Sequence, residues 1–125
     1  AGLFETALEA GEIVTKIAFT VPAEAGYGKF RNPASRYPMA GVFVAKQADG
    51  SVRVAVTGAG ASGVFRWSEA ESALSGNFSA DALSGLAVDA GALMSDLHGT
   101  AEYRANLVKV MAGRAVANMG GAVIV

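Results

Sequence analysis

The chain has 125 residues, of which 52% are hydrophobic, and its ten Lys and Arg nearly balance its eleven Asp and Glu. This length and apolar content support one domain with its own core, and the balanced charge argues against nucleic acid or an anionic membrane as a partner. Cysteine is absent and His98 is the single histidine, which excludes disulfides, Cys-ligated metal clusters, and metal or acid–base sites that need two histidines.

The chain also lacks the sequence features of membrane-inserted or secreted proteins. No apolar run approaches the roughly 20 residues that span a bilayer. The first residues do not show the order of basic, apolar and small residues that marks a signal peptide. We therefore expect a cytoplasmic protein without membrane insertion.

The first quarter of the chain is predicted to form two strands. Residues 12–21 mix β-branched, aromatic and polar side chains and end at Pro22, which predicts a strand. Residues 26–32 alternate large side chains with small or polar ones, which predicts a second strand. One side of this second strand presents three large polar or charged side chains, namely Tyr27, Lys29 and Arg31.

A proline-rich connection and a hairpin follow. Residues 32–38 contain two prolines, which restrict their neighbours and predict an ordered surface loop of the kind that often carries function. Residues 39–45 and 51–57 are apolar and β-branched, and Asp49-Gly50 lies between them. An Asp-Gly step between two such runs predicts an antiparallel hairpin.

The second half of the chain is predicted to be helical. Ser68 and Glu71 fit a capping box before a short helix that stops at Gly76-Asn77. Ser79 is predicted to cap a further helix, short or broken because it contains two glycines. Its expected inward residues are Leu83, Leu86 and Val88.

The clearest helix is predicted from Thr100 to about Asn118. Its inward stripe is expected to consist of Tyr103, Leu107, Val110 and Met111. The apolar tail 122–125 could add an edge strand or fray. Because strands precede helices instead of alternating with them, we expect an antiparallel sheet covered on one face by helices.

The segment 58–63, GAGASG, matches the glycine pattern of dinucleotide-binding loops, with Asp81 at roughly the expected distance. That pattern requires a helix immediately after the glycines, whereas residues 64–67 are predicted to be extended. The preceding strand also belongs to a hairpin and not to a parallel βαβ unit. We therefore favour a flexible glycine-rich exit from a strand.

Two further groups of polar residues favour structural roles. His98 precedes the last helix and could act as an acid or base, but a hydrogen-bonded loop histidine is the favoured interpretation. Three cations on the last helix could contact an anion or a partner, yet a solvated face with Glu102 nearby is favoured. These three are Arg104, Lys109 and Arg114.

Three other cations flank the proline-containing loop, namely Lys29, Arg31 and Arg36. A stiff loop could hold such donors toward a phosphate or a flavin ring. The alternative is a basic edge that protects the sheet from aggregation. The residues alone leave both interpretations open.

Four segments of the chain together resemble a known family. They are, in chain order, ALEAGEIVTKIAFTVP, YGKFRNPASRYPMAGVFVA, FRWSEAESAL and DLHGTAEYRANLVKVMAGRAV. The chain resembles the C-terminal domain of the FAD-binding medium subunit of carbon monoxide dehydrogenase, within the xanthine dehydrogenase family of molybdenum hydroxylases. The likeness runs from about Ala7 to Asn118. Its most specific parts are KFRNPASRYPMAG and the AEYR that opens the last helix.

The resemblance implies a two-layer α+β sandwich, with an antiparallel sheet of three or four strands packed on about three helices. It implies that residues 1–11 are the tail of a preceding FAD subdomain or a linker, that residues 12–119 form the domain, and that residues 120–125 are a C-terminal tail. The flavin pyrophosphate loops of the family lie upstream of the matching region, so the segment 58–63 is not one of them.

The resemblance further implies a role inside a larger redox assembly. The full-length subunit would carry FAD mainly on its preceding subdomains, and this chain alone is expected neither to bind FAD nor to be active. The partners would be a large subunit with a molybdenum cofactor and a small subunit with 2Fe-2S clusters, which pass electrons to the flavin. The domain would help to enclose FAD and to dock the subunits. A purely structural or subunit-interaction module without flavin contact is the alternative.

In the family, the segment that matches residues 28–37 approaches the flavin, and a lysine there contacts FAD. The resemblance implies that Lys29 takes this role. Arg31 competes with it, because residues 32–36 depart from the better known relatives. Both are predicted to bind FAD, and no catalytic or metal-binding residue is predicted.

Overall fold

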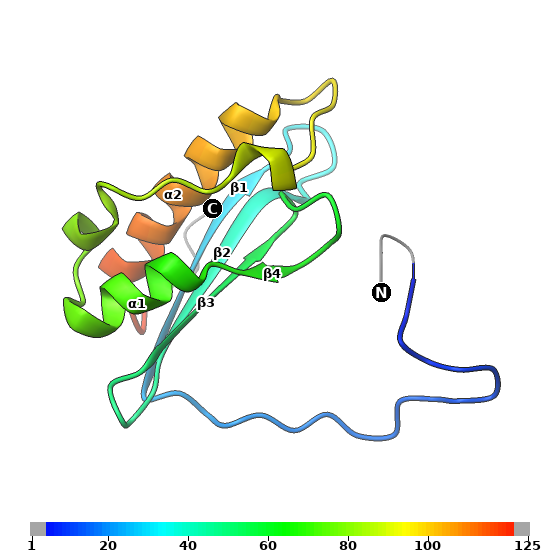
Figure 1. Cartoon of the computed structure of the whole chain (residues 1–125), viewed down its shortest axis with the longest axis horizontal. Helices are drawn as coiled ribbons and strands as arrows, with labels where there is room; N and C mark the ends of the chain where they lie inside the picture. Colours follow the sequence, from blue (N-terminus) through cyan, green and yellow to red (C-terminus); the bar gives the residue numbers. More distant parts are fainter. Residues whose placement is uncertain (1–4, 122–125) are drawn as a thin grey trace.

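The computed structural model of the chain describes residues 5–121. A four-stranded antiparallel sheet in the order β1-β2-β3-β4 forms one layer, and helices cover one of its faces (Figure 1). The strands are β1 (Glu24–Arg31), β2 (Pro38–Lys46), β3 (Val52–Thr57) and β4 (Phe65–Arg66). The helices are α1 (Ser68–Gly76) and α2 (Ala101–Ala117), with two short 3-10 helices between them, η1 (Ala80–Leu83) and η2 (Ala90–Ala92). The predicted α+β two-layer architecture is confirmed.

The predicted hairpin is formed by β2 and β3, which pair from Lys46 opposite Val52 to Gly41 opposite Thr57. Local chemistry closes the connecting turn. The Asp49 carboxylate accepts hydrogen bonds from the backbone N–H and the hydroxyl of Ser51. Gly50 adopts a φ of 84°, in the left-handed region that favours glycine.

The core lies between the helical layer and the inner face of the sheet. Alternate residues of β2 and β3 point inward, and α1 and α2 supply the facing side chains. Gly26 and Gly28 occupy the two buried positions of β1, and Phe30, which is partly buried, packs against the core near the end of the strand. These glycines let the α2 backbone lie directly on β1. The main buried side chains are Val42, Val44, Val52, Val54, Val56, Trp67, Leu74, Leu107, Val108 and Met111.

Helix α2 begins as predicted, since the Thr100 hydroxyl accepts a hydrogen bond from the backbone N–H of Tyr103. The predicted inward stripe is correct for Leu107 and Met111, which are buried. It is wrong for Tyr103 and Val110, which are 43% and 38% exposed. The buried stripe is rotated slightly around the helix and also contains Arg104, Val108, Ala112, Ala115 and Val116.

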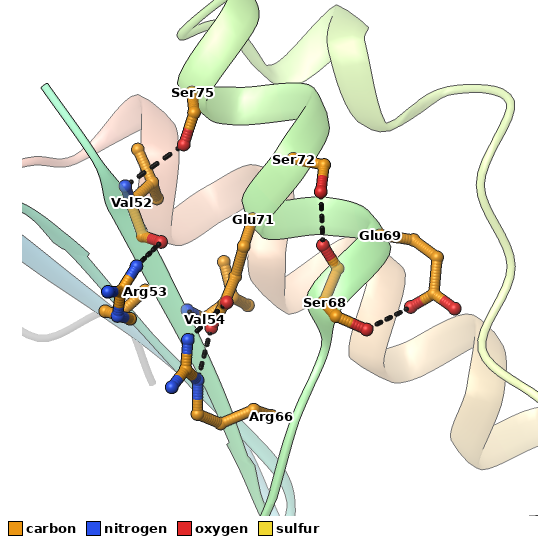
Figure 2. Close-up of polar contacts among 9 residues, drawn as sticks. All are labelled: Val52, Arg53, Val54, Arg66, Ser68, Glu69, Glu71, Ser72 and Ser75. Carbon is orange, nitrogen blue, oxygen red and sulfur yellow. Dashed lines mark hydrogen bonds and ion pairs between the residues drawn. The ribbon is translucent and has the colours of Figure 1, made fainter.

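The predicted capping box at the start of α1 is wrong. Trp67 is the N-cap residue and the structure shows no side-chain capping hydrogen bond there. Glu71 turns to the sheet instead, where its carboxylate accepts hydrogen bonds from the Val54 backbone N–H at 2.9 Å and from the Arg66 guanidinium (Figure 2). The Ser75 hydroxyl accepts from the Val52 N–H at 3.1 Å.

These contacts give α1 a second role beyond filling the core. Strand β4 pairs only with Ala55 and Val56 of β3, so the rest of that strand edge needs other partners. Glu71 and Ser75 supply acceptors for two of its N–H groups. Helix α1 thereby covers an edge that would otherwise be available to another strand.

Replacing Glu71 with Gln should lower the free energy of unfolding at pH 7 by about 2 kcal/mol, because charge-assisted hydrogen bonds to a buried carboxylate are lost. Burial raises the pKa of Glu71, but hydrogen bonds from Arg66 and Val54 outweigh burial and hold the pKa below its usual value of 4.5. A depressed folded-state pKa stabilises above pH 4.5, and that contribution is lost as the pH falls through the folded value. Urea unfolding should therefore show the two proteins converging below about pH 4.5. The exposed Glu69→Gln change is the control, and a difference that stays constant down to pH 3 would contradict this role.

The strand predicted at residues 12–21 is wrong for this structure. The segment is irregular, all of its residues are exposed, and it extends away from the sheet before β1 (Figure 1). Only its continuation meets the sheet, where the Ala23 N–H donates to the Lys46 carbonyl. The segment has the sequence pattern of a strand, but no strand within residues 5–121 lies beside it.

The helix predicted after Ser79 is reduced to η1, and no side-chain hydrogen bond from Ser79 caps it. Leu83 and Val88 are buried as predicted, and Leu86 is half-buried. Residues 84–100 cross the helical layer as turns and the short helix η2. No helix within residues 5–121 is long and apolar enough to cross a bilayer. The predicted tail 122–125 lies outside the described residues.

Candidate functional site

The candidate site is the cationic rim, defined here as Lys29, Arg31 and Arg36 with the loop 32–38. Its position follows from the alternation of β1. Gly28 lies against the backbone of Met111 in α2, so the neighbouring Lys29 stands on the opposite face of the sheet. A register shift after Phe30 brings Arg31 opposite Pro38, where the strand gives way to the loop.

Asn32 organises the loop from inside. It is 1% exposed, and its side-chain oxygen accepts hydrogen bonds from the backbone N–H groups of Ala34 at 2.9 Å and Ser35 at 3.4 Å. Its side-chain nitrogen donates to the Tyr37 hydroxyl at 3.2 Å. Backbone hydrogen bonds from Asn32 to Tyr37 and from Arg36 to Asn32 close the turn. A loop with this many internal hydrogen bonds holds the attached side chains in a defined place.

Arg36 stands out in this loop because its φ is 60°. A residue other than glycine costs free energy in the left-handed region, and such strain often accompanies a functional loop. Arg31, Asn32, Pro33 and Arg36 line an open hollow of about 250 Å³. Both arginines are exposed, and guanidinium groups suit anionic or planar polar ligands. The structure therefore brings Arg31 and Arg36 to one hollow.

Lys29 lies beside this hollow and does not line it. The residue opposite Lys29 on β2 is Gly41, and the Tyr27 hydroxyl lies over that glycine. A Cβ at Gly41 would approach the Tyr27 oxygen to 2.3 Å, so the glycine makes room for the phenol ring. Burial raises the pKa of Tyr27 above its ordinary value. The face of the sheet that carries Lys29 therefore also carries a partly sheltered tyrosine.

The residue that sequence analysis missed is Arg104. It was expected on a solvated helix face, but it is 0% exposed. Its Nη1 donates to the carbonyl oxygens of Met39 at 2.9 Å and Gly58 at 3.2 Å. Its Nη2 donates to both oxygens of the Asp96 carboxylate, at 3.0 and 2.8 Å. One guanidinium thus joins α2 to the start of β2, the end of β3 and the loop before α2.

The hydrogen bonds of Arg104 fix the end of the cationic rim, because Met39, whose carbonyl accepts one of them, directly follows the loop 32–38. A hydrogen bond from the backbone N–H of His98, together with the bonds from Arg104, holds the pKa of Asp96 below its ordinary value. The sequence did contain a signal for the buried arginine. Arg104 shares the helical spacing of Leu107, Val108 and Met111, and only its charge argued against burial.

The other cations predicted on α2 lie differently. Lys109 is half-buried and its ammonium donates to the carbonyl of Ser84, while Arg114 is exposed near the end of the helix. His98 is exposed in a loop, and its backbone N–H donates a hydrogen bond to the Asp96 carboxylate. These residues do not form a common site with the cationic rim.

The glycine-rich segment 58–63 is a loop between β3 and β4, and α1 begins only at Ser68. The expectation that no helix directly follows the glycines is confirmed. Gly58 has a φ of 78°, and a Cβ there would meet the Pro38 carbonyl at 2.0 Å. Ala61 and Met94 supply backbone bonds that join this loop to the segment around η2. Close packing accounts for Gly58 and Gly60, and Gly63 has a positive φ of 105° that favours glycine.

Within residues 5–121, no three His, Asp or Glu side chains gather where they could hold a metal ion. The fold and the candidate site define a class, namely a small α+β domain with an exposed, hydrogen-bonded cationic loop at one end of its sheet.

Comparison with known proteins adds one relative. The chain is 34% identical over 128 residues to the medium subunit of nicotine 6-hydroxylase from Paenarthrobacter nicotinovorans. The match includes 95% of this chain and 45% of that protein, so the chain spans less than half the length of the relative. No family model and no solved structure matches. The similarity is to a hydroxylase medium subunit, and the narrower likeness to carbon monoxide dehydrogenase stays a prediction.

Proposed function

We propose that the chain is the C-terminal domain of the flavoprotein (medium) subunit of a molybdenum hydroxylase. In this role it helps to enclose FAD and to dock the subunits for electron transfer from molybdenum and iron–sulfur centres to the flavin. The similarity to a hydroxylase medium subunit over 95% of the chain supports the proposal. FAD belongs to the full-length subunit, and partner subunits hold the molybdenum cofactor and the 2Fe-2S clusters.

The observation that carries the flavin part of the proposal is the exposure of the cationic rim. Arg31 and the loop residues 33–37 are exposed, and Lys29 lies on the face opposite α2. A rim buried in the core or covered by helices could not reach a cofactor held by other polypeptide. The internal hydrogen bonds of Asn32 keep the rim in place before any ligand arrives.

The residues present fit a supporting role toward FAD and not the main binding role. Two guanidinium groups beside one hollow offer donors to anionic or polar ring atoms. When bound, FAD supplies the redox chemistry. A cation held near the ring stabilises negative charge that accumulates there on reduction, and this raises the reduction potential.

The experiment is a potential measurement on the full-length subunit with Lys29→Ala and, separately, Arg31→Ala. Loss of the cation that faces the flavin should lower the two-electron potential by on the order of 30 mV, which corresponds to about a tenfold change in the equilibrium constant. Arg114→Ala removes an exposed cation far along α2 and is the control. Redox titration followed by flavin absorbance measures all three.

The result also decides between the two candidate residues. A shift for Lys29→Ala alone assigns the contact to Lys29, and a shift for Arg31→Ala alone assigns it to Arg31. Potentials unchanged in both variants, with FAD content intact, would remove the cationic rim from the flavin site.

The second candidate function is a structural or subunit-interaction module with no flavin contact. It is favoured by the partly exposed Tyr103 and Val110, which lie on α2 among residues otherwise polar or small on its outer side. Hydrogen–deuterium exchange of the assembled complex separates the two. Protection gained only within residues 100–118 supports docking alone, whereas protection of residues 29–37 supports the flavin-facing role.

A further inference from the structure

The feature left without a role is the extended segment 12–21. It precedes β1 and runs away from both layers of the domain (Figure 1). Five of its ten residues are large and apolar, and each is between 63% and 81% exposed. Exposed apolar side chains are ordinary when scattered singly, but a continuous group of this kind marks an interaction surface.

The apolar residues of the segment are arranged with the period of a strand. Its odd positions after Glu12 are Ile13, Thr15, Ile17, Phe19 and Val21. Its even positions are Glu12, Val14, Lys16, Ala18 and Thr20. In an extended chain these two sets point to opposite faces, so one face is almost wholly apolar and the other is mainly polar or small. This is the pattern of a strand in an antiparallel sheet with one face buried and one face in water.

The described part of the chain offers this face no adequate cover. Phe19 borders an open hollow beside the β2–β3 turn, but it remains 81% exposed. The segment joins β1 through Pro22 and a bend at Ala23, and it runs away from that strand instead of back along it (Figure 1). The helices cover the other side of the sheet. The apolar face is therefore left without cover by residues 5–121 of its own chain.

We propose that residues 12–21 form a β-strand that adds to a sheet edge in the flavin-binding part of the same subunit, with Ile13, Ile17, Phe19 and Val21 packed on that part. The inference rests on the proposed function, because it needs the longer subunit. The nicotine 6-hydroxylase medium subunit supports this choice of partner, because the match with 95% of this chain covers only 45% of that protein. That protein has ample further polypeptide to supply a sheet edge.

Such a strand would also position the cationic rim. Residues 12–21 continue through Pro22 into β1, and β1 carries Lys29 and Arg31. A strand held in one domain that is joined to the edge strand of the next by only two residues, Pro22 and Ala23, leaves little freedom for a hinge between them. The strand thereby sets the distance from the rim to the flavin-binding part.

Hydrogen–deuterium exchange of the full-length subunit and of the chain 1–125 tests the strand. We expect the amides of residues 13–21 to exchange freely in the chain alone and at least about tenfold more slowly in the subunit, since ladder hydrogen bonds protect them. Free exchange in the subunit would overturn the proposal. The proposal would also be overturned if residues 13–21 exchanged slowly in the chain alone and their protection increased with chain concentration. That result would show that the segment pairs with a second copy of the chain.

A matched pair of substitutions in the full-length subunit tests which face is buried. Ile17→Asp places a carboxylate on the apolar face, and Ala18→Asp places the same group on the neighbouring, outward position. We expect loss of protection in residues 13–21 for Ile17→Asp and its retention for Ala18→Asp. If Ile17→Asp and Ala18→Asp changed the protection of residues 13–21 equally, the assignment of the apolar face as the buried face would be refuted. If Ile17→Asp prevents folding, Ile17→Thr makes the same comparison while keeping a β-branched side chain.

The two proposals can fail separately. A subunit that binds FAD and responds to Lys29→Ala, but leaves residues 13–21 freely exchanging, overturns the strand alone. A subunit that protects residues 13–21 but lacks FAD overturns the proposed function alone.

Discussion

Replacing Arg104 with Met is expected to lower the free energy of unfolding by about 3 kcal/mol, because buried main-chain carbonyls lose their donor, whereas the Asp96 side chain is 38% exposed and can return to water. The guanidinium is fully buried and satisfies the carbonyls of Met39 and Gly58 as well as the Asp96 carboxylate. A methionine side chain fills most of the volume of the arginine side chain but has no hydrogen-bond donor. The Met39 and Gly58 carbonyls would then lack their guanidinium donor.

Urea denaturation monitored by Trp67 fluorescence measures this effect. Arg114→Met makes the same change at an exposed site on the same helix and should stay within about 0.5 kcal/mol of the parent chain. A double-mutant cycle with Asp96→Asn isolates the coupling between Arg104 and Asp96. An Arg104→Met protein as stable as Arg114→Met would show that this network does not hold the domain together.

Replacing Gly26 with Ala should cost about 3 kcal/mol, at the upper end of the range for overpacked cores. A Cβ at this position would lie 2.2 Å from the Ala115 carbonyl oxygen, and the same change at Gly28 would approach the Met111 carbonyl to 2.5 Å. Both contacts are with backbone atoms of α2, which cannot move aside as a flexible side chain can. The helix would have to lift from β1 and open the core beneath it.

Gly113→Ala is the matched control, because Gly113 lies within α2 and a Cβ there meets only the Ala80 methyl at 3.9 Å. This substitution should stabilise the protein by up to about 1 kcal/mol through helix propensity. Thermal unfolding of both variants shows the contrast as opposite shifts in Tm. Equal Tm values for Gly26→Ala and the parent would show that α2 does not rest directly on β1.

The elements that sequence analysis predicted correctly are those specified by local chemistry. Asp49-Gly50 closes the hairpin through its own side-chain and backbone geometry. Thr100 caps α2 with its own hydroxyl. In each case the residues that set the structure lie within a few positions of one another, so their pattern is visible in the sequence.

The errors arose where a distant partner outweighed a local preference. Glu71 has the spacing of a capping box, but Val54 and Arg66 bind its carboxylate more fully than an N-terminal N–H could. Arg104 carries a charge that normally stays in water, but two carbonyls and Asp96 accept hydrogen bonds from its two Nη atoms inside the protein, and only its Nε lacks a partner among the described residues. Residues 12–21 have the pattern of a strand, but a strand also requires a neighbour.

In the candidate site, too, local signals were visible in the sequence and long-range contacts were not. The positions of Lys29, Arg31 and Arg36 around a proline-stiffened loop were visible in the sequence. That Arg31 and Arg36 line one hollow, and that Lys29 stands beside it, depends on a register shift after Phe30. That Lys29 or Arg31 reaches a flavin stays a prediction, which the potential measurements test.

Composition, turn residues and apolar spacing by themselves determined that this chain forms an antiparallel sheet with helices on one face, because those signals act over a few residues. Only the tertiary structure decided that β1 meets α2 through bare glycines, that an arginine lies in the core, and that an apolar strand pattern is left in water. These features depend on groups far apart in the chain, whose hydrogen bonds and close contacts exist only once the layers have packed.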